Sequence, residues 1–186
     1  MRLILTTLIV AVSIGYLGGG RLVGLAGLEL RWAWLALAGV ALQFVPWNGL
    51  PGVATLLLSF AALITFGLAN VRRPGFALIV IGLALNLTVI AVNRGMPVTR
   101  DALVSSGQAS TLASLVADGG NKHHLAGATD ELVVLGDWIG VGSPIRQAIS
   151  VGDLFVNIGA GWFIVIAMRG ARRTERTEET AIGSAG

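Results

Sequence analysis

Two neighbouring histidines and two separate aspartates are the residue types in this sequence that are suited to acid–base or metal chemistry. His123 and His124 follow Lys122, and Asp137 and Asp153 come later in the chain. Imidazole titrates near neutral pH and is a common metal ligand. Adjacent helical residues point about 100° apart, however, and a zinc-binding histidine pair is usually spaced i, i+4. The spacing therefore favours a polar loop, in which one ring bonds a carbonyl or a carboxylate, over a shared metal.

Asp137 lies in an apolar stretch, 132–139, which is too short to cross a bilayer and too apolar to be solvated. A carboxylate in such surroundings must be paired, hydrogen-bonded or protonated. One interpretation is a structural acceptor for backbone N–H groups and for a basic side chain, with Arg94, Arg146 and Lys122 as the candidates. The alternative is a general acid or base with a raised pKa.

The candidate catalytic set is His124, Asp137 and Asp153, and the sequence leaves any metal or cofactor open. Asp153 also has a structural explanation, because Ser150 and Asp153 match a Ser-x-x-Asp capping box at the start of an apolar run. Lys122 is expected to pair with a carboxylate, and His123 remains a further polar candidate.

Three asparagines occur within or beside the apolar runs, namely Asn86, Asn93 and Asn157. Such asparagines usually hydrogen-bond between helices at contacts of small residues. The functional alternative is a polar cavity between the last two apolar runs, roofed by Asp137 and His124.

Composition determines the elements that must position these side chains. The chain has 186 residues, of which 54% are hydrophobic and 12% charged, and its mean hydropathy is +0.79. Soluble domains carry about 25% charged residues. These figures exclude an ordinary soluble enzyme, a disordered chain and a nucleic-acid binder. The lipid bilayer is the expected partner, and a protein partner or homo-oligomer is left open.

We expect an all-α transmembrane bundle of five spans, near 3–17, 32–45, 51–70, 75–92 and 150–168, in one domain covering 1–168. A span needs about 20 residues, so 32–45 is short and either crosses or re-enters. The outward region 93–149 is expected to carry short surface or re-entrant helices. Helices are predicted over 100–106, capped by Thr99, and over 109–117.

Basic residues set the expected orientation. Arg72 and Arg73 lie between two spans, and further arginines follow the last span at 169–176. The positive-inside rule places both clusters in the cytoplasm, with the C-terminus inside and 93–149 facing outward. The tail, 169–186, is charged and then small and polar, which predicts disorder.

Several short motifs resemble those of a small bacterial integral-membrane family known as a domain of unknown function. They are Asn93-Arg94-Gly95-Met96-Pro97-Val98, Lys122-His123, Leu135-Gly136-Asp137-Trp138-Ile139 and Ser150-Val151-Gly152-Asp153, with Gly19-Gly20-Arg21-Leu22 near the first span. The resemblance covers nearly all of 1–168. It implies a bacterial membrane location and supplies no reaction, substrate or catalytic residue.

Three functions follow as hypotheses. The first is an uncharacterised membrane protein that serves in binding or assembly, with an outward-facing cap. The second is an enzyme at the outer leaflet, which requires His124, Asp137 and Asp153 to converge on an open cavity. The third is a small-molecule or lipid passage, which requires a continuous polar void lined by Asn86 and Asn157.

Overall fold

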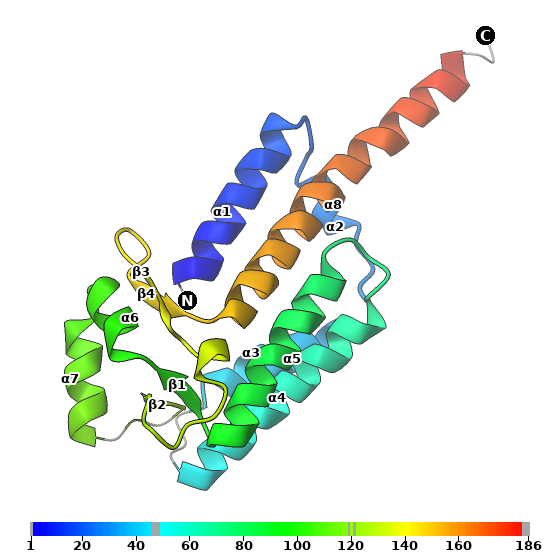
Figure 1. Ribbon diagram of the computed structural model, residues 1–186. Helices are drawn as coiled ribbons and strands as arrows, with labels where there is room; N and C mark the ends of the chain where they lie inside the picture. The colour runs from blue at the N-terminus through cyan, green and yellow to red at the C-terminus, as the bar shows by residue number, and fades with distance from the viewer. Residues whose placement is uncertain (1, 46–48, 119, 121, 184–186) are drawn as a thin grey trace.

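The computed structural model describes residues 2–45, 49–118, 120 and 122–183, and beyond residue 170 it describes the backbone alone. Long apolar helices form a bundle, and a smaller cap of short elements covers one end of it (Figure 1). The elements in chain order are α1 (Arg2–Leu17), α2 (Val23–Ala26), α3 (Ala33–Gln43), α4 (Gly49–Ala69), α5 (Phe76–Asn93), β1 (Met96–Val98), α6 (Arg100–Ser105), α7 (Ala109–Asp118), β2 (His123–Leu125), the 3-10 helix η1 (Val133–Leu135), β3 (Ile139–Val141), β4 (Gln147–Ile149) and α8 (Val151–Gly183).

Within the described residues, three helical segments are long and apolar enough to cross a membrane: Leu50–Ala69, Phe76–Asn93 and Val151–Gly170. The helices α1 and α3 are also apolar but have 16 and 11 residues. At 1.5 Å per residue they extend roughly 24 and 17 Å, short of a hydrocarbon core of about 30 Å. The mostly helical bundle is confirmed, and the arrangement of five spans stays a prediction.

In the bundle α8 packs antiparallel to α5, α5 antiparallel to α4 and α4 antiparallel to α3, whereas α1 packs parallel to α8 (Figure 1). Glycine permits the close approach of α5 and α8. A Cβ atom built on Gly159 of α8 would lie 2.5 Å from the carbonyl oxygen of Gly75, and one on Gly152 would lie 2.6 Å from that of Gly82. The two backbones therefore touch along this interface, as small residues allow between apolar helices.

The connections that carry Arg21, Arg31, Arg72 and Arg73 lie at the end of the bundle away from the cap (Figure 1). The Arg21 amide donates to the Met168 carbonyl at 2.9 Å, and the Arg31 amide donates to Asn70 Oδ1 at 3.0 Å. Arg72 and Arg73 lie in the connection between α4 and α5, next to Asn70. This arginine end consists of Arg21, Arg31, Arg72, Arg73 and Arg169.

The helix α3 runs between the two ends of the bundle. Its N-terminal end follows Arg31 at the arginine end, and its C-terminal end lies beside Lys122 of the cap, whose ammonium donates to the carbonyls of Gln43 and Val45. It packs along α4 over this length. The helix α3 therefore extends from the arginine end toward the cap, and whether 32–45 crosses a membrane stays a prediction.

The described residues of the cap add four three-residue strands to the mostly helical fold, where the sequence predicted only helices and loops. The strands β1 and β2 pair in parallel, with Met96 opposite His123, and β3 and β4 pair antiparallel, with Ile139 opposite Ile149. Glycine, proline and β-branched residues in this region disfavour helix and favour extended backbone. The short helices α6 and α7 lie within one residue of the bounds expected from the sequence.

The strand β1 joins the two hydrophobic cores. Met96 packs with Phe60 and Ile90 in the core of the bundle, and Val98 packs with Leu103 in the core of the cap. Three consecutive residues therefore place the cap against the ends of α4 and α5.

The helix α8 begins at the predicted capping box. The Asp153 amide donates to Ser150 Oγ at 3.0 Å, and the Ser150 amide donates to the Asp153 carboxylate at 3.1 Å. The backbone of the helix is described as far as Gly183; the disorder expected over 169–186 stays a prediction, and 184–186 lie outside the described residues. Arginine, glutamate and alanine are good helix formers, and each extends a helix already begun within the bundle.

Candidate ligand cavity

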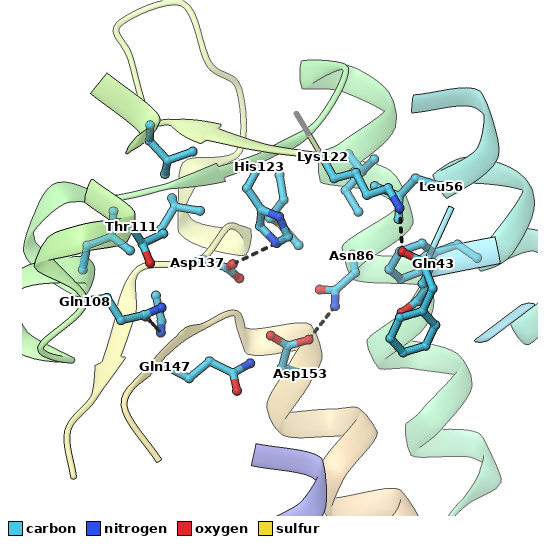
Figure 2. A pocket seen from close by; sticks show the side chains of 18 of the residues that line it. Gln43, Leu56, Asn86, Gln108, Thr111, Lys122, His123, Asp137, Gln147 and Asp153 are labelled. Atoms are coloured by element: carbon cyan, nitrogen blue, oxygen red, sulfur yellow. Dashed lines mark hydrogen bonds and ion pairs between the residues drawn. The ribbon is translucent and has the colours of Figure 1, made fainter. Parts of the chain in front are cut away.

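A cavity of about 860 Å³ lies between the cap and the cap-side ends of α3, α4, α5 and α8 (Figure 2). Part of its wall is apolar, with Leu56, Phe60, Ile90 and Leu115 among the lining residues. Its polar lining includes Asn86, Lys122, His123, Asp137 and Asp153. The combination of apolar walls with a few converging polar groups is typical of small-molecule sites.

Asp137 is the buried carboxyl of this cavity. The residue is 6% exposed, and its Oδ1 atom has no hydrogen-bond partner among the described residues. Its backbone is held next to β1, because the Asp137 amide donates to Pro97 and the Thr99 amide donates to Asp137. The side chain is therefore placed by a fixed backbone, although part of its own hydrogen-bonding capacity is unused.

Two effects raise the pKa of Asp137 to about 8. Burial, the larger effect, disfavours the charged form, and the nearby negative charge of Asp153 adds to it. The carboxyl group is therefore mainly protonated at neutral pH. A protonated carboxyl can donate one hydrogen bond and accept others, whereas an ionised carboxylate can only accept.

His123 faces Asp137 from β2, with 3.8 Å between its Nε2 atom and Asp137 Oδ2 (Figure 2). The His123 side chain lines the cavity and is 57% exposed, so the surrounding protein excludes only part of the water around it. This burial lowers its pKa, as do the charges of His124 and Lys122, while Asp153 acts in the opposite direction. His123 is accordingly neutral at pH 7.

His124 does not join the cavity. Its Nε2 atom lies 2.9 Å from Asp130 Oδ1, in the loop after β2, and Asp130 Oδ2 accepts the Gly127 amide at 2.8 Å. Burial of Asp130 acts to raise its pKa, but these two hydrogen bonds outweigh it, and the pKa is lowered. Successive residues of a strand point to opposite faces. Therefore only one of the two adjacent histidines faces the cavity, and it is His123.

Asp153 and Asn86 form a hydrogen-bonded network between α8 and α5. Asn86 Nδ2 donates to Asp153 Oδ1 at 2.9 Å (Figure 2), and Ser150 Oγ donates to Asn86 Oδ1 at 2.9 Å. Asn86 is 4% exposed. The network fixes the Asp153 carboxylate at the cavity wall, so Asp153 serves the helix cap and also lines the cavity.

The other two asparagines make structural contacts outside the cavity lining. Asn157 Oδ1 accepts the Thr7 hydroxyl at 2.8 Å, which links α8 to α1. Asn93 both donates to and accepts from the backbone of Glu131, at 2.8 Å each, which ties the end of α5 to the cap. The contact of Asn157 matches the expectation that asparagine bonds between helices, whereas Asn93 bonds to a loop of the cap.

Lys122 is bonded to backbone rather than to a carboxylate. Its ammonium donates to the Gln43 carbonyl and, at 2.9 Å, to the Val45 carbonyl. These carbonyls end α3, where the negative end of the helix dipole favours a cation. The expected pairing of Lys122 with a carboxylate is replaced by this contact.

The structure thus brings Asp137 and Asp153 to one cavity with His123 in place of His124. Sequence analysis missed Gln108 and Gln147, which also line the cavity. The alternation of side chains in an extended 122–125 segment is the signal that would have separated the two histidines. In the part of the chain that the structure describes, no three His, Asp or Glu side chains are grouped closely enough to hold a metal ion.

These features define a class of protein, a helical bundle with three helices able to span a membrane and a capped cavity at one end. The chain belongs to a family of unknown function, DUF5317, whose model matches residues 27–165. It is similar to an uncharacterized protein of Thermotoga maritima, with 35% identity over 131 residues that cover 69% of this chain and 70% of that protein. No solved structure matches the chain. The family match contains every cavity-lining residue named above.

Proposed function

We propose that this chain is a bacterial inner-membrane protein that binds a small amphipathic molecule in the cavity between its bundle and its cap. The observation that carries the proposal is Asp137, a buried carboxyl that lines the cavity and has an oxygen without a partner among the described residues. Buried polar atoms are nearly always hydrogen-bonded, because leaving one unpaired costs roughly 1–3 kcal/mol. A bound molecule supplies the missing partner.

The membrane location is supported by the distribution of arginine. Five arginines lie at one end of the bundle, and the cap lies at the other. Under the positive-inside rule the arginine end is cytoplasmic and the cap faces outward. In this arrangement α1 and α3 complete five spans, the N-terminus is outside and the C-terminus is inside.

The binding proposal is tested by asking whether a small molecule stays bound to the protein through purification. Native mass spectrometry of the purified protein in mild detergent should detect a bound small molecule that denaturation releases. The variant Leu115→Trp narrows the cavity and should lose that molecule, whereas Leu58→Trp, an exposed position on α4 outside the cavity lining, should keep it. Equal occupancy in the wild type and Leu115→Trp would count against the proposal.

A second candidate is an enzyme acting at the outer leaflet, and the geometry of His123 and Asp137 favours it. At 3.8 Å the two groups are close enough to exchange a proton through a bound substrate, and the usual order of their pKa values is reversed, with that of Asp137 raised to about 8 and that of His123 lowered. The enzyme predicts that the retained molecule is converted during incubation. Binding alone predicts that it is released unchanged.

The passage hypothesis has less support. It requires a polar void between α5 and α8, but these helices touch at Gly82 with Gly152 and at Gly75 with Gly159. The contacts close the interface on the side of the cavity that faces the arginine end. The described cavity therefore fits a binding pocket better than it fits a channel.

A further inference from the structure

We infer that the cavity recognises its ligand by a primary ammonium group carried on an apolar body. This inference rests on the proposed function, since it names the chemical class of the molecule that the cavity takes. It follows from three observations: the charged groups that line the cavity, the hydrogen-bond partners of each of these groups, and the apolar residues in the rest of the cavity wall.

The carboxyl groups of Asp137 and Asp153 both line the cavity. The Asp137 side chain is 9% exposed, and its Oδ1 atom is unpartnered among the described residues. Asp153 accepts hydrogen bonds from Asn86 and from the Ser150 amide, which are neutral donors. Two carboxyl groups in one enclosed site repel each other when ionised, and a cation placed between them relieves that repulsion.

The basic side chain that lines the cavity does not supply this cation. The Lys122 ammonium is bonded to the carbonyls of Gln43 and Val45 at the end of α3. In the described part of the chain, no lysine or arginine lies within ion-pair distance of Asp137 or Asp153. The positive charge of Lys122 is therefore balanced by the carbonyls at the end of α3, and the two carboxyl groups keep unused acceptor capacity.

The imidazole of His123 is the cation-forming group next to Asp137. Its Nε2 atom is 3.8 Å from Asp137 Oδ2, beyond hydrogen-bond distance. A ligand ammonium has three N–H donors and can reach a carboxylate oxygen and an amide oxygen together. The gap near Asp137 suits such a donor.

The apolar part of the cavity wall indicates the chemistry of the ligand beyond its ammonium group. Leu56, Phe60, Ile90 and Leu115 are apolar, and a volume of about 860 Å³ is far larger than a single ion needs. An apolar chain on the ammonium would remove this surface from water at about 25 cal/mol per Å². A primary alkylammonium and a lipid with an ethanolamine headgroup share this chemistry.

The test compares probes that have the same chain and different charge. The full-length protein is reconstituted in nanodiscs of phosphatidylcholine, which has no primary ammonium. Binding of n-octylammonium, n-octanol and n-octanoate is measured by titration calorimetry, with empty nanodiscs as the blank. We expect the ammonium probe to bind at least roughly tenfold more tightly than octanol, and octanoate to bind least tightly, because an ion pair in an enclosed site is worth more than about 1.4 kcal/mol.

Two matched variants separate the site from general partitioning. In Asp137→Asn the preference for ammonium over octanol should fall to near one, while octanol still binds and so reports a folded cavity. In Asp130→Asn, which removes a carboxylate that pairs with His124 outside the cavity lining, the preference should remain. An unchanged preference in Asp137→Asn would overturn the inference.

Each other outcome is also decisive. Equal binding of octanol and octylammonium by the wild type, or tighter binding of octanoate, overturns the inference and leaves the proposed binding function standing. Failure of all three probes to bind the wild type overturns the proposed function itself. A short-chain phosphatidylethanolamine that binds more tightly than octylammonium identifies a lipid as the source of the ammonium, and the reverse order identifies a free amine.

Discussion

The carboxyl of Asp137 and the imidazole of His123 face each other across 3.8 Å under the cap, with the pKa of the first raised and that of the second lowered. At neutral pH the pair holds its proton on the carboxyl. Moving that proton to the ring would leave the net charge of the pair at zero. The pair is therefore neutral in the absence of a ligand, and a bound cation would favour the ionised form of Asp137.

The raised pKa of Asp137 predicts a characteristic pH dependence of stability. The folded chain keeps the carboxyl protonated up to about pH 8, whereas the unfolded chain releases that proton near 3.8. Between these values unfolding releases a proton, so the free energy of unfolding falls as pH rises. Asp137→Asn has no such proton. The melting temperature of this variant minus that of the wild type should therefore increase by several degrees between pH 5 and pH 8.5.

Thermal unfolding in detergent, followed by circular dichroism at several pH values, checks this prediction. The difference in melting temperature between the wild type and Asp137→Asn is the quantity to compare, because the other titrating groups are common to both proteins. A constant difference across this pH range would show that Asp137 is already ionised in the folded protein at pH 5.

The contribution of Asp130 to the free energy of unfolding should depend on pH with the opposite sign to that of Asp137. Its pKa is lowered in the folded chain by the Gly127 amide and His124, so its contribution to stability is present above about pH 4 and is lost as pH falls through the lowered value. Asp130→Asn should lower the free energy of unfolding by about 1 kcal/mol at pH 7. The same comparison at pH 3 should show little difference, and a loss that persists in acid would contradict this assignment.

The contact between α5 and α8 predicts a position-specific effect of a single methyl group. A Cβ atom on Gly159 would lie 2.5 Å from the Gly75 carbonyl oxygen, whereas one on Gly161 would lie 3.6 Å from Thr7 Cγ2, an ordinary contact. Gly159→Ala should therefore lower stability by roughly 1–3 kcal/mol. Gly161→Ala is the matched control and should be nearly neutral. Similar melting temperatures for the two variants would mean that the helices are further apart.

The network of Asn86 predicts a cost for losing its side chain. Asn86→Ala leaves the Ser150 hydroxyl without its acceptor and removes a donor from Asp153. Buried groups deprived of their partners cost roughly 1–3 kcal/mol each. Thr88→Ala on the same helix is the control, because the Thr88 hydroxyl is bonded to the Ala84 carbonyl within its own helix. A loss no larger than that of the control would argue against the network.

Topology is tested by labelling single cysteines, since the chain has none of its own. Ser110→Cys in α7 should react with a membrane-impermeant maleimide on intact spheroplasts, and Thr177→Cys in the tail should react only after permeabilisation. The expected pattern follows from the arginine end facing the cytoplasm. Labelling of both positions from the same side would reject the proposed orientation.

The parts of the fold that depend on local chemistry could be predicted from the sequence. The capping box of Ser150 and Asp153 and the cap at Thr99 are both present, because such motifs depend on a few adjacent residues. The three long apolar helices follow from length and hydropathy. The four short strands could not be predicted, because strands of three residues are too short to show an alternating pattern.

The cavity could be predicted only in part. The apolar surroundings of Asp137 in the sequence correctly indicated a buried carboxyl. The pairing of β1 with β2 turns His123 toward the cavity and His124 toward Asp130, and this depends on a contact between segments far apart in the chain. The contact of Lys122 with the end of α3 is likewise nonlocal, so a rule based on neighbouring charges assigned it to a carboxylate instead.

The central claim is that a buried, protonated Asp137 carboxyl lies in a ligand cavity. The most direct measurement is an infrared titration of the wild type minus Asp137→Asn, in which the carbonyl band of a protonated carboxyl is followed with pH. We expect this band to persist until about pH 8 in the empty protein and to disappear at lower pH when n-octylammonium is bound. A difference spectrum without that band from pH 5 upward would contradict the account.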